Sequence, residues 1–218
     1  MCDPVELRIM TASSFPTGTG SYAYRQRFEV IVRDIGGDQS VLICDENGEQ
    51  AARRADQLHD GRERWRLETA VPVHRFSVKY NVAGVTFWDD NNGQGYHLSL
   101  VADGFAALLG HSYQIVLGAA SLVDGWLTAV AGVRNLAYDK QVGLLYSTDD
   151  WASFRPGAGR YRSTHVTGTE VWTTRVDVGD ADHVSFAMFV RAAGAEHWDN
   201  NFGADYRLAR GMSIPVEG

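Results

Sequence analysis

The chain has 218 residues, which is long for one ordinary domain and sufficient for two small ones. Hydrophobic residues make up 44% and charged residues 22%, a globular composition that excludes a disordered chain. The 20 Lys and Arg residues against 27 Asp and Glu residues give a net charge of −7. This acidity argues against a protein held to nucleic acid or to an anionic membrane by bulk charge, and it favours a neutral or small ligand.

Cysteine content and hydropathy exclude further classes of protein. Two cysteines exclude a disulfide framework and a four-cysteine metal site. The first residues show no basic region followed by an apolar stretch, so no secretory signal is expected. No run approaches the roughly 18 apolar residues that a membrane helix needs. We therefore expect a cytoplasmic protein with no contact to a membrane.

Taken in chain order, the apolar patterns predict mainly short strands. Residues 28–32 and 141–146 are rich in β-branched and aromatic residues, 76–80 alternates with period two, and 184–190 is apolar throughout. Residues 50–58 and 105–109 are each compatible with a helical turn, but convincing helical periodicity is nearly absent. With 23 Gly residues and 11% aromatic residues, the chain is expected to be all-β.

The chain contains an internal repeat. Residues 87–98 recur at 197–208, and Trp, Asp, Asn, Gly, Tyr and Leu keep the same spacing at a shift of 110 residues. Residues 32–41 are mirrored by 133–142 in the same way, at a shift of 101. Repeats of about 100 residues built from short strands predict two tandem immunoglobulin-like antiparallel β-sandwiches. We place the first domain at 1–104 and the second at 105–218.

The repeated segment has the composition of an exposed loop. Asp and Asn tolerate left-handed turns, and here they lie between a Trp and a Tyr. One interpretation is a structural turn, with the two Tyr residues in the core and their hydroxyls bonded to backbone. The other is a sugar site, because sugar C–H faces stack on aromatic rings while Asn and Asp bond to hydroxyls.

The second copy resembles carbohydrate-binding module family 21, the starch- and glycogen-binding domain of fungal glucoamylases and of glycogen-targeting subunits of protein phosphatase 1. Three segments in the family's order carry the resemblance, at 133–142, 147–151 and 198–206. The resemblance covers roughly residues 111–210. It implies an immunoglobulin-like sandwich that binds α-1,4-glucan and catalyses nothing.

The resemblance also implies roles for individual residues of the second copy. Trp151 and Trp198 match the main sugar-stacking aromatics, and Asn200, followed by Asn201, matches a polar contact beside them. Asp205 stands where the family usually has Asn, so that contact becomes an acceptor only. Ala187 replaces a third aromatic residue of some members. Tyr138 matches an aromatic residue of a second, separate site, although it is equally compatible with a Tyr that packs on its own sheet.

The first copy keeps the repeated segment at 87–98, which we call its hairpin, and little else of the family's pattern. Its candidate binding residues are Trp88, Asp90, Asn91 and Asn92. Gln50 stands opposite Trp151, so the first domain has one stacking aromatic where the second has two. We expect it to be a divergent relative of the second domain, with lower affinity for sugar.

The residue patterns that would indicate an enzyme, a metal site or a phosphatase-docking motif are weaker. Adjacent Asp pairs on a strand point to opposite faces, which does not suit the two carboxylates of a glycosidase. The seven His residues show no metal-ligand spacing, and a calcium site would need a loop of alternating ligands that is not present. A phosphatase-docking motif is superficially matched at 184–186, but we expect this segment to be buried.

The sequence therefore predicts a non-catalytic protein that binds α-1,4-glucan, as glycogen, starch or a maltooligosaccharide, with no metal and no cofactor. Nucleic acid and membranes are not expected as partners, whereas an unidentified protein partner stays open. The alternative is a protein-interaction or targeting module that keeps the fold and has lost its affinity for sugar.

Overall fold

The computed structural model describes residues 3–17, 22–98 and 104–214. Within these residues every strand pairing is antiparallel, and one short 3-10 turn at Asn201–Gly203 is the only helical element. The expected all-β class with antiparallel sheets is therefore confirmed. The chain divides into two compact units, Met1–Ser112 and Tyr113–Gly218.

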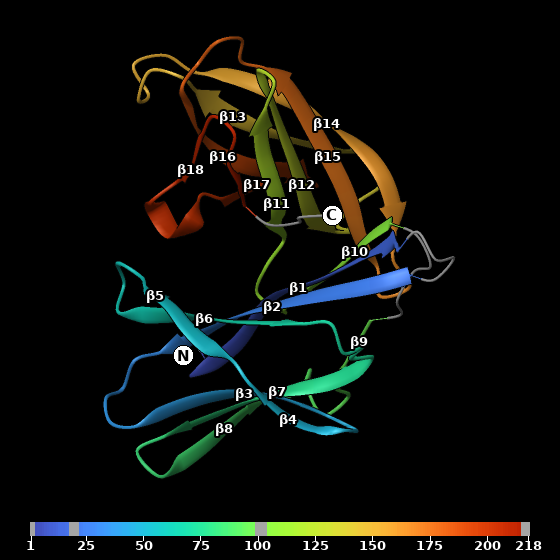
Figure 1. Cartoon of the computed structure of the whole chain (residues 1–218), viewed down its shortest axis with the longest axis vertical. Coiled ribbons are helices and arrows are strands. Elements are labelled where there is room, and N and C mark those ends of the chain that lie inside the picture. The colour runs from blue at the N-terminus through green and yellow to red at the C-terminus, as the bar shows by residue number, and fades with distance from the viewer. Residues whose placement is uncertain (1–2, 18–21, 99–103, 215–218) are drawn as a thin grey trace. The chain divides into compact units, whose positions relative to one another are not determined.

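The first unit consists of two sheets (Figure 1). One sheet has the order β10(Gly104–Leu109)-β1(Val5–Pro16)-β2(Tyr22–Arg33)-β6(Arg62–Thr69)-β5(Arg53–Gln57). The other sheet has the order β4(Gly48–Ala51)-β3(Gln39–Asp45)-β7(Arg75–Val82)-β8(Val85–Asp89), and its fifth strand, β9(Tyr96–His97), also pairs with β7. Alternate side chains of β7 are buried, because one face of this strand contributes to the core and the other does not.

The second unit is one curled sheet of nine strands. Its order is β17(Ala195–Asp199)-β16(His183–Ala192)-β13(Lys140–Ser147)-β14(Arg155–Thr164)-β15(Thr169–Asp177)-β12(Trp126–Arg134)-β11(Ile115–Val123)-β19(Ser213–Ile214), with β18(Tyr206–Ala209) beside β16. The first residues of β14 pair with β13 and its last residues pair with β15, so this strand joins two layers. Gly159 lies on the bend, where a Cβ atom would stand 2.7 Å from the carbonyl oxygen of Val142.

The two predicted helical turns are wrong. Residues 105–109 lie in β10, which pairs with β1, and residues 50–58 contain the second half of β4 and all of β5. Both segments are short and have ambiguous local preferences, so pairing with neighbouring strands determines their conformation. Because β10 pairs with β1, the first unit extends to Ser112 and does not end at residue 104 as expected.

The strands of the two units pair in the same order. β11 pairs with β12 and β19 as β1 pairs with β2 and β10, and β14 takes the place of β4 and β5 together. A β-bulge interrupts the first pairing between Leu7 and Ile9 in one unit and between Leu117 and Ala119 in the other. These bulges lie 110 residues apart, which is the shift of the sequence repeat.

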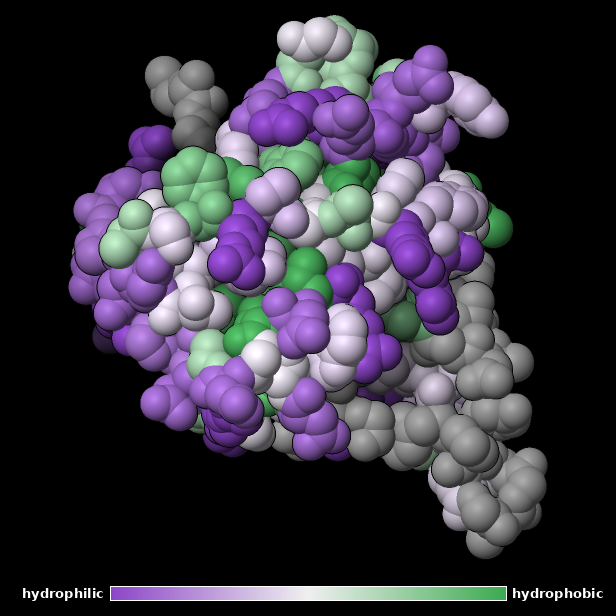
Figure 2. All heavy atoms as spheres, turned by 90° about the horizontal axis from the view of Figure 1, so that it is seen from above, coloured by the Kyte–Doolittle hydropathy of each residue, from purple (hydrophilic) through white to green (hydrophobic). Residues whose placement is uncertain are grey.

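Side chains on the surface are mixed in character. Hydrophilic and hydrophobic residues alternate over the described surface seen in Figure 2. Among the described residues, no helix is long and apolar enough to cross a membrane. Individual aromatic side chains stand out instead, because Trp88, Trp126 and Trp198 are all exposed.

Candidate functional site

The loop between β17 and β18 is held from below by a buried carboxylate. Oδ2 of Asp199 accepts a hydrogen bond from the backbone N–H of Leu117 at 2.6 Å and from the hydroxyl of Tyr206 at 2.8 Å. The ring of Tyr206 stacks on Phe186, with 5.4 Å between the ring centroids. Asp199 is 5% exposed, so it anchors the loop to the sandwich and offers no surface to a ligand.

The loop itself is folded by its own Asn side chains. Oδ1 of Asn200 accepts from the N–H of Gly203 at 3.0 Å, and Nδ2 of Asn201 donates to the carbonyl oxygen of Asp205 at 3.0 Å. Asn201, Phe202 and Asp205 all have φ between 54° and 59°, a region that favours Asn, Asp and Gly. Asn200 is exposed, and its Nδ2 amide group has no partner among the described residues.

Trp198 precedes this loop and presents its ring to the outside. The side chain is 40% exposed, and its inner side contacts Phe189, whose ring centroid lies 5.4 Å away. The indole Nε1–H donates to Oε1 of Glu196 at 2.5 Å, and Oε2 of the same carboxylate accepts from Arg191. The hydrogen bond from Arg191 is the largest cause that lowers the pKa of Glu196. The ring is therefore fixed in orientation by a charged acceptor.

Trp151 reaches the same loop from the β13–β14 turn. Its backbone N–H donates to Oγ of Ser147 at 2.8 Å, and its φ of 69° places it in the left-handed region. Asp149 closes the turn through Ser153, and this hydrogen bond is the main reason that the pKa of Asp149 is lowered to about 2. Burial raises the pKa of the Asp205 carboxyl, and the side chain of Trp151 beside it has a smaller, opposite effect.

The structure thus brings together most of the residues predicted for the second copy. Asp205 contacts Trp151 through its carboxylate and Asn201 through its carbonyl group, and Asn200 and Trp198 adjoin them in the chain. Tyr138 stands apart on the connection between β12 and β13 and is 100% exposed. This full exposure rules out a Tyr that packs on its own sheet.

Three neighbours of Trp198 were not predicted as parts of the site, namely Phe189, Arg191 and Glu196. Arg191 lies over the Phe189 ring at 4.5 Å, so the three side chains and Trp198 form one contact chain. The signal in the sequence is the spacing of Glu196 and Trp198, because residues two apart on a strand share a face. Ala187 is buried and provides no aromatic surface.

The hairpin of the first unit repeats these backbone contacts. Asp89 accepts from the N–H of Leu7 at 2.6 Å and from the hydroxyl of Tyr96 at 2.8 Å, and each of these residues lies 110 positions before its counterpart. Oδ1 of Asp90 accepts from the N–H of Gly93 at 2.8 Å, in the place of Asn200. Nδ2 of Asn91 donates to Gly95 at 2.8 Å, as Asn201 donates to Asp205.

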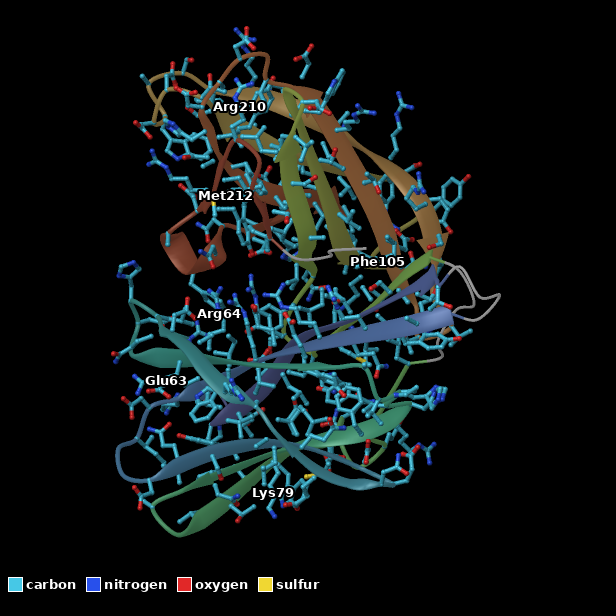
Figure 3. The ribbon with its side chains drawn as sticks, viewed as in Figure 1. Glu63, Arg64, Lys79, Phe105, Arg210 and Met212 are labelled. Atoms are coloured by element: carbon cyan, nitrogen blue, oxygen red, sulfur yellow. The ribbon has the colours of Figure 1, made fainter. Side chains whose placement is uncertain are left out.

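The surroundings of the first hairpin differ. Trp88 is 52% exposed, and Lys79 lies 5.6 Å from its ring centroid. Thr86 stands at the position of Glu196 and donates to Asn81, so the indole of Trp88 has no charged acceptor among the described residues. Lys79, on the strand next to Trp88, is labelled in Figure 3. Asn92 has a φ of 56° and takes the place of Phe202.

Among the described residues, no group of three His, Cys, Asp or Glu side chains could hold a metal ion. The segment Val184, Ser185 and Phe186 lies within β16 with all three residues buried, as expected.

The second unit matches a known protein family. Residues 112–209 match the family described as Carbohydrate/starch-binding module (family 21), a non-catalytic binding module. The resemblance inferred from the sequence is therefore confirmed for the second unit, and the matched span does not include the first.

Two curated relatives are similar over less than half of this chain. Glycogen-binding subunit 76A of Drosophila melanogaster is 33% identical over 100 residues, which are 43% of this chain and 15% of that protein. Protein phosphatase 1 regulatory subunit 3E of Rattus norvegicus is 35% identical over 115 residues, which are 48% of this chain and 38% of that protein. The chain thus spans well under half the length of these relatives.

Two solved structures are also similar. The starch binding domain of Rhizopus oryzae glucoamylase, solved with beta-cyclodextrin and maltoheptaose, is 22% identical with a TM-score of 0.36, covering 45% of this chain and 95% of that one. The carbohydrate binding module of the muscle glycogen-targeting subunit of Protein Phosphatase-1 is 20% identical with a TM-score of 0.39, covering 44% and 75%.

Proposed function

We propose that the chain binds α-1,4-glucan through its second unit and catalyses no reaction on it. The observation that carries the proposal is the exposed ring of Trp198, fixed by Glu196 directly beside a polar loop. An aromatic face held in one orientation suits the C–H face of a glucose ring, and it binds at a low cost in conformational entropy. The match of residues 112–209 to a carbohydrate-binding family supports the same assignment.

Each predicted residue takes a role that its contacts allow. Trp198 provides the stacking face, and the free Nδ2 group of Asn200 donates to a sugar hydroxyl. Trp151 adds a second, half-buried ring, beside Asp205. The amide group of Asn201 donates to the carbonyl oxygen of Asp205 within the loop. We therefore assign Asn201 to positioning the loop and not to direct contact with the sugar.

Tyr138 forms a second, separate contact for glucan in this proposal. Its ring is fully exposed and has no hydrogen bond or ring contact among the described residues, so both faces are available for stacking. A polymer that reaches both Tyr138 and Trp198 gains from an effectively intramolecular second contact.

The first unit is proposed to be a weaker site of the same kind. Trp88, Asp90, Asn91 and Asn92 keep the hairpin, but a Thr replaces Glu196 and no ring corresponds to Trp151. The shared hydrogen bonds of the two hairpins support descent from one repeated module.

The second candidate function is a targeting or protein-interaction module. The names of several relatives, such as Protein phosphatase 1 regulatory subunit 3E, favour this alternative. The buried segment at Val184, Ser185 and Phe186 cannot serve as the docking element, so a partner would have to bind elsewhere.

Affinity electrophoresis in gels with and without soluble glycogen separates the two candidates. We expect the parent chain to be retarded by glycogen and Trp198→Ala to be retarded much less. Tyr161→Ala removes another exposed aromatic residue of the same unit and serves as the control. A parent chain that migrates equally in both gels would favour the interaction module and contradict glucan binding.

A further inference from the structure

Three arginines surround a groove on the sheet of the second unit, and none of the residues assigned to glucan lines this groove. Arg160 and Arg162 lie on β14, Arg175 lies on β15, and Trp126 lies on β12. Together with Ala158 and Thr173 they line a cavity of about 670 Å³, which we call the arginine groove. This volume lies in the range of pockets that hold small ligands.

The strand register explains why these side chains share one face. Arg160 stands directly opposite Thr173, and Arg175 opposite Thr128, and directly opposed residues of antiparallel strands point to the same side. Ala158 precedes Arg160 by two residues, so a small side chain opens the space beside the guanidinium groups.

Trp126 holds one of the arginines in place. The guanidinium group of Arg175 lies 4.2 Å from the centroid of the Trp126 ring, which is the geometry of a cation–π contact. This contact uses the flat face of the guanidinium group and leaves its N–H groups at the edge free to bond. Asp177 is opposite Trp126, but its Oδ1 accepts from the N–H of Gly179 at 2.8 Å.

The three arginines of the groove have no ion pair among the described residues. This distinguishes them from other arginines of the same unit, since Arg191 pairs with Glu196 and Arg210 with Asp180. Three exposed cations on one face of a chain with a net charge of −7 form a local positive site.

The first unit carries a carboxylate at the matching place. There Glu29 is buried and pairs with Arg8, Arg64 and Arg66, and Arg64 is labelled on β6 in Figure 3. Burial alone would raise the pKa of Glu29, but the surrounding arginines bring it down to about 2.

The second unit lacks this carboxylate. Val32 and Val133 pair with the first residues of β1 and β11, Val5 and Ile115, so they are equivalent positions. Counting back three residues from each places Val130 where the first unit has Glu29. The arginines of the second unit therefore face a sheet whose internal anion has been replaced by a hydrocarbon side chain.

We infer that the arginine groove binds a phosphate monoester carried on a glucose unit of the ligand. Arginine forks bind phosphate oxygens in pairs, which makes them better suited to phosphate than to a hydroxyl group. The net negative charge of the chain disfavours large polyanions such as nucleic acid, whereas a single phosphate group is small enough to be bound locally. That the phosphate is attached to glucose rests on the proposed function.

The test uses the full chain and the indole N–H signal of Trp126 in nuclear magnetic resonance spectra, assigned with Trp126→Phe. The probes are glucose 6-phosphate, inorganic phosphate, glucose and a polyglutamate peptide. We expect glucose 6-phosphate to shift the signal with saturation, to bind more tightly than inorganic phosphate, and to weaken as salt is raised. Glucose alone should produce no shift.

A double variant, Arg160→Gln with Arg175→Gln, should bind glucose 6-phosphate at least about tenfold more weakly, because two charge-assisted bonds are lost. Its matched control is Arg53→Gln with Arg210→Gln, which removes the same number of positive charges. Arg53 is the counterpart of Arg160 in the first unit, and Arg210 lies in the second unit outside the arginine groove. The control should bind like the parent chain.

Binding of unphosphorylated maltoheptaose, followed in the same samples, separates this inference from the proposed function. The double variant should keep its affinity for maltoheptaose. Equal binding of glucose 6-phosphate by the parent and the double variant, or no binding by the parent, would overturn the inference even if maltoheptaose binds. Tighter, arginine-dependent binding of polyglutamate would also overturn it and would assign the groove to an acidic protein.

Discussion

The indole of Trp198 donates a hydrogen bond of 2.5 Å to Glu196, the residue two positions earlier on β17. The same carboxylate accepts from Arg191 on the neighbouring strand, whose guanidinium group lies over Phe189 beneath the Trp198 ring. An exposed tryptophan would otherwise sample several rotamers. This contact chain places its ring in one orientation before any ligand arrives, and such preorganisation lowers the entropic cost of binding.

The first prediction follows from this contact. Glu196→Ala should weaken maltoheptaose binding by about two- to tenfold, the value of one net hydrogen bond, while the unfolding midpoint changes little because the carboxylate is exposed. Glu196→Gln retains an acceptor for the indole and should restore most of the affinity. Calorimetric titration measures both.

The control for that experiment is Thr86→Ala, which alters the corresponding position of the first hairpin. It should leave the affinity for maltoheptaose nearly unchanged. An equal loss in Glu196→Ala and Glu196→Gln would show that the acceptor does not position the ring.

The second prediction concerns the two buried anchors. Asp199→Ala leaves the N–H of Leu117 and the hydroxyl of Tyr206 without their acceptor, so it should lower the free energy of unfolding by about 1–3 kcal/mol or more. Asp89→Ala should act similarly on the first unit through Leu7 and Tyr96. Urea unfolding monitored by tryptophan fluorescence gives both values.

Asn200→Ala is the comparison for that pair, because it changes an exposed loop residue next to Asp199. Its effect on unfolding should be clearly smaller than that of Asp199→Ala. If Asp199→Ala unfolds at the same urea concentration as the parent, the carboxylate is not an anchor.

The third prediction is a pH dependence set by Glu29. Its folded pKa of about 2 lies below the ordinary value of 4.5, so its contribution to stability is present above about pH 4.5 and is lost as pH falls towards 2. Glu29→Gln should destabilise the chain at pH 7 by roughly 3–5 kcal/mol, since it leaves buried arginines such as Arg8 and Arg64 without their carboxylate.

The measurement is urea unfolding at pH 7, 4 and 3 for the parent and the variant. The difference between the two proteins should be largest at pH 7 and should shrink at pH 3. A difference that stays constant over this range would mean that the charge of Glu29 contributes nothing to stability.

The sequence predicted the hairpins better than it predicted the sheets around them. The Trp, Asn and Gly positions of 197–208 are constrained locally, since Asn201 and Asp205 must adopt a positive φ and Asp199 must reach a fixed backbone N–H. Because few residue types meet these local requirements, the hairpin can be recognised from the sequence. Trp151 and Asp205 lie more than 50 residues apart in the chain, and only the family resemblance assigned both of them to one site.

The errors arose where tertiary pairing overrides local preference. Residues 105–109 contain two Ala and two Leu residues, which are good helix formers, but they extend along β1 as an edge strand. The role of Glu196 was missed for another reason. Its two neighbours, Arg191 and Trp198, become adjacent to one carboxylate only when β16 and β17 pair.

The most direct test of glucan binding by the second unit is calorimetric titration of the full chain with maltoheptaose, comparing the parent, Trp88→Ala and Trp198→Ala. We predict measurable binding by the parent, a small loss in Trp88→Ala, and a loss of at least about fivefold in Trp198→Ala with the fold retained. No heat of binding for the parent, or equal affinity in the parent and Trp198→Ala, would contradict the assignment.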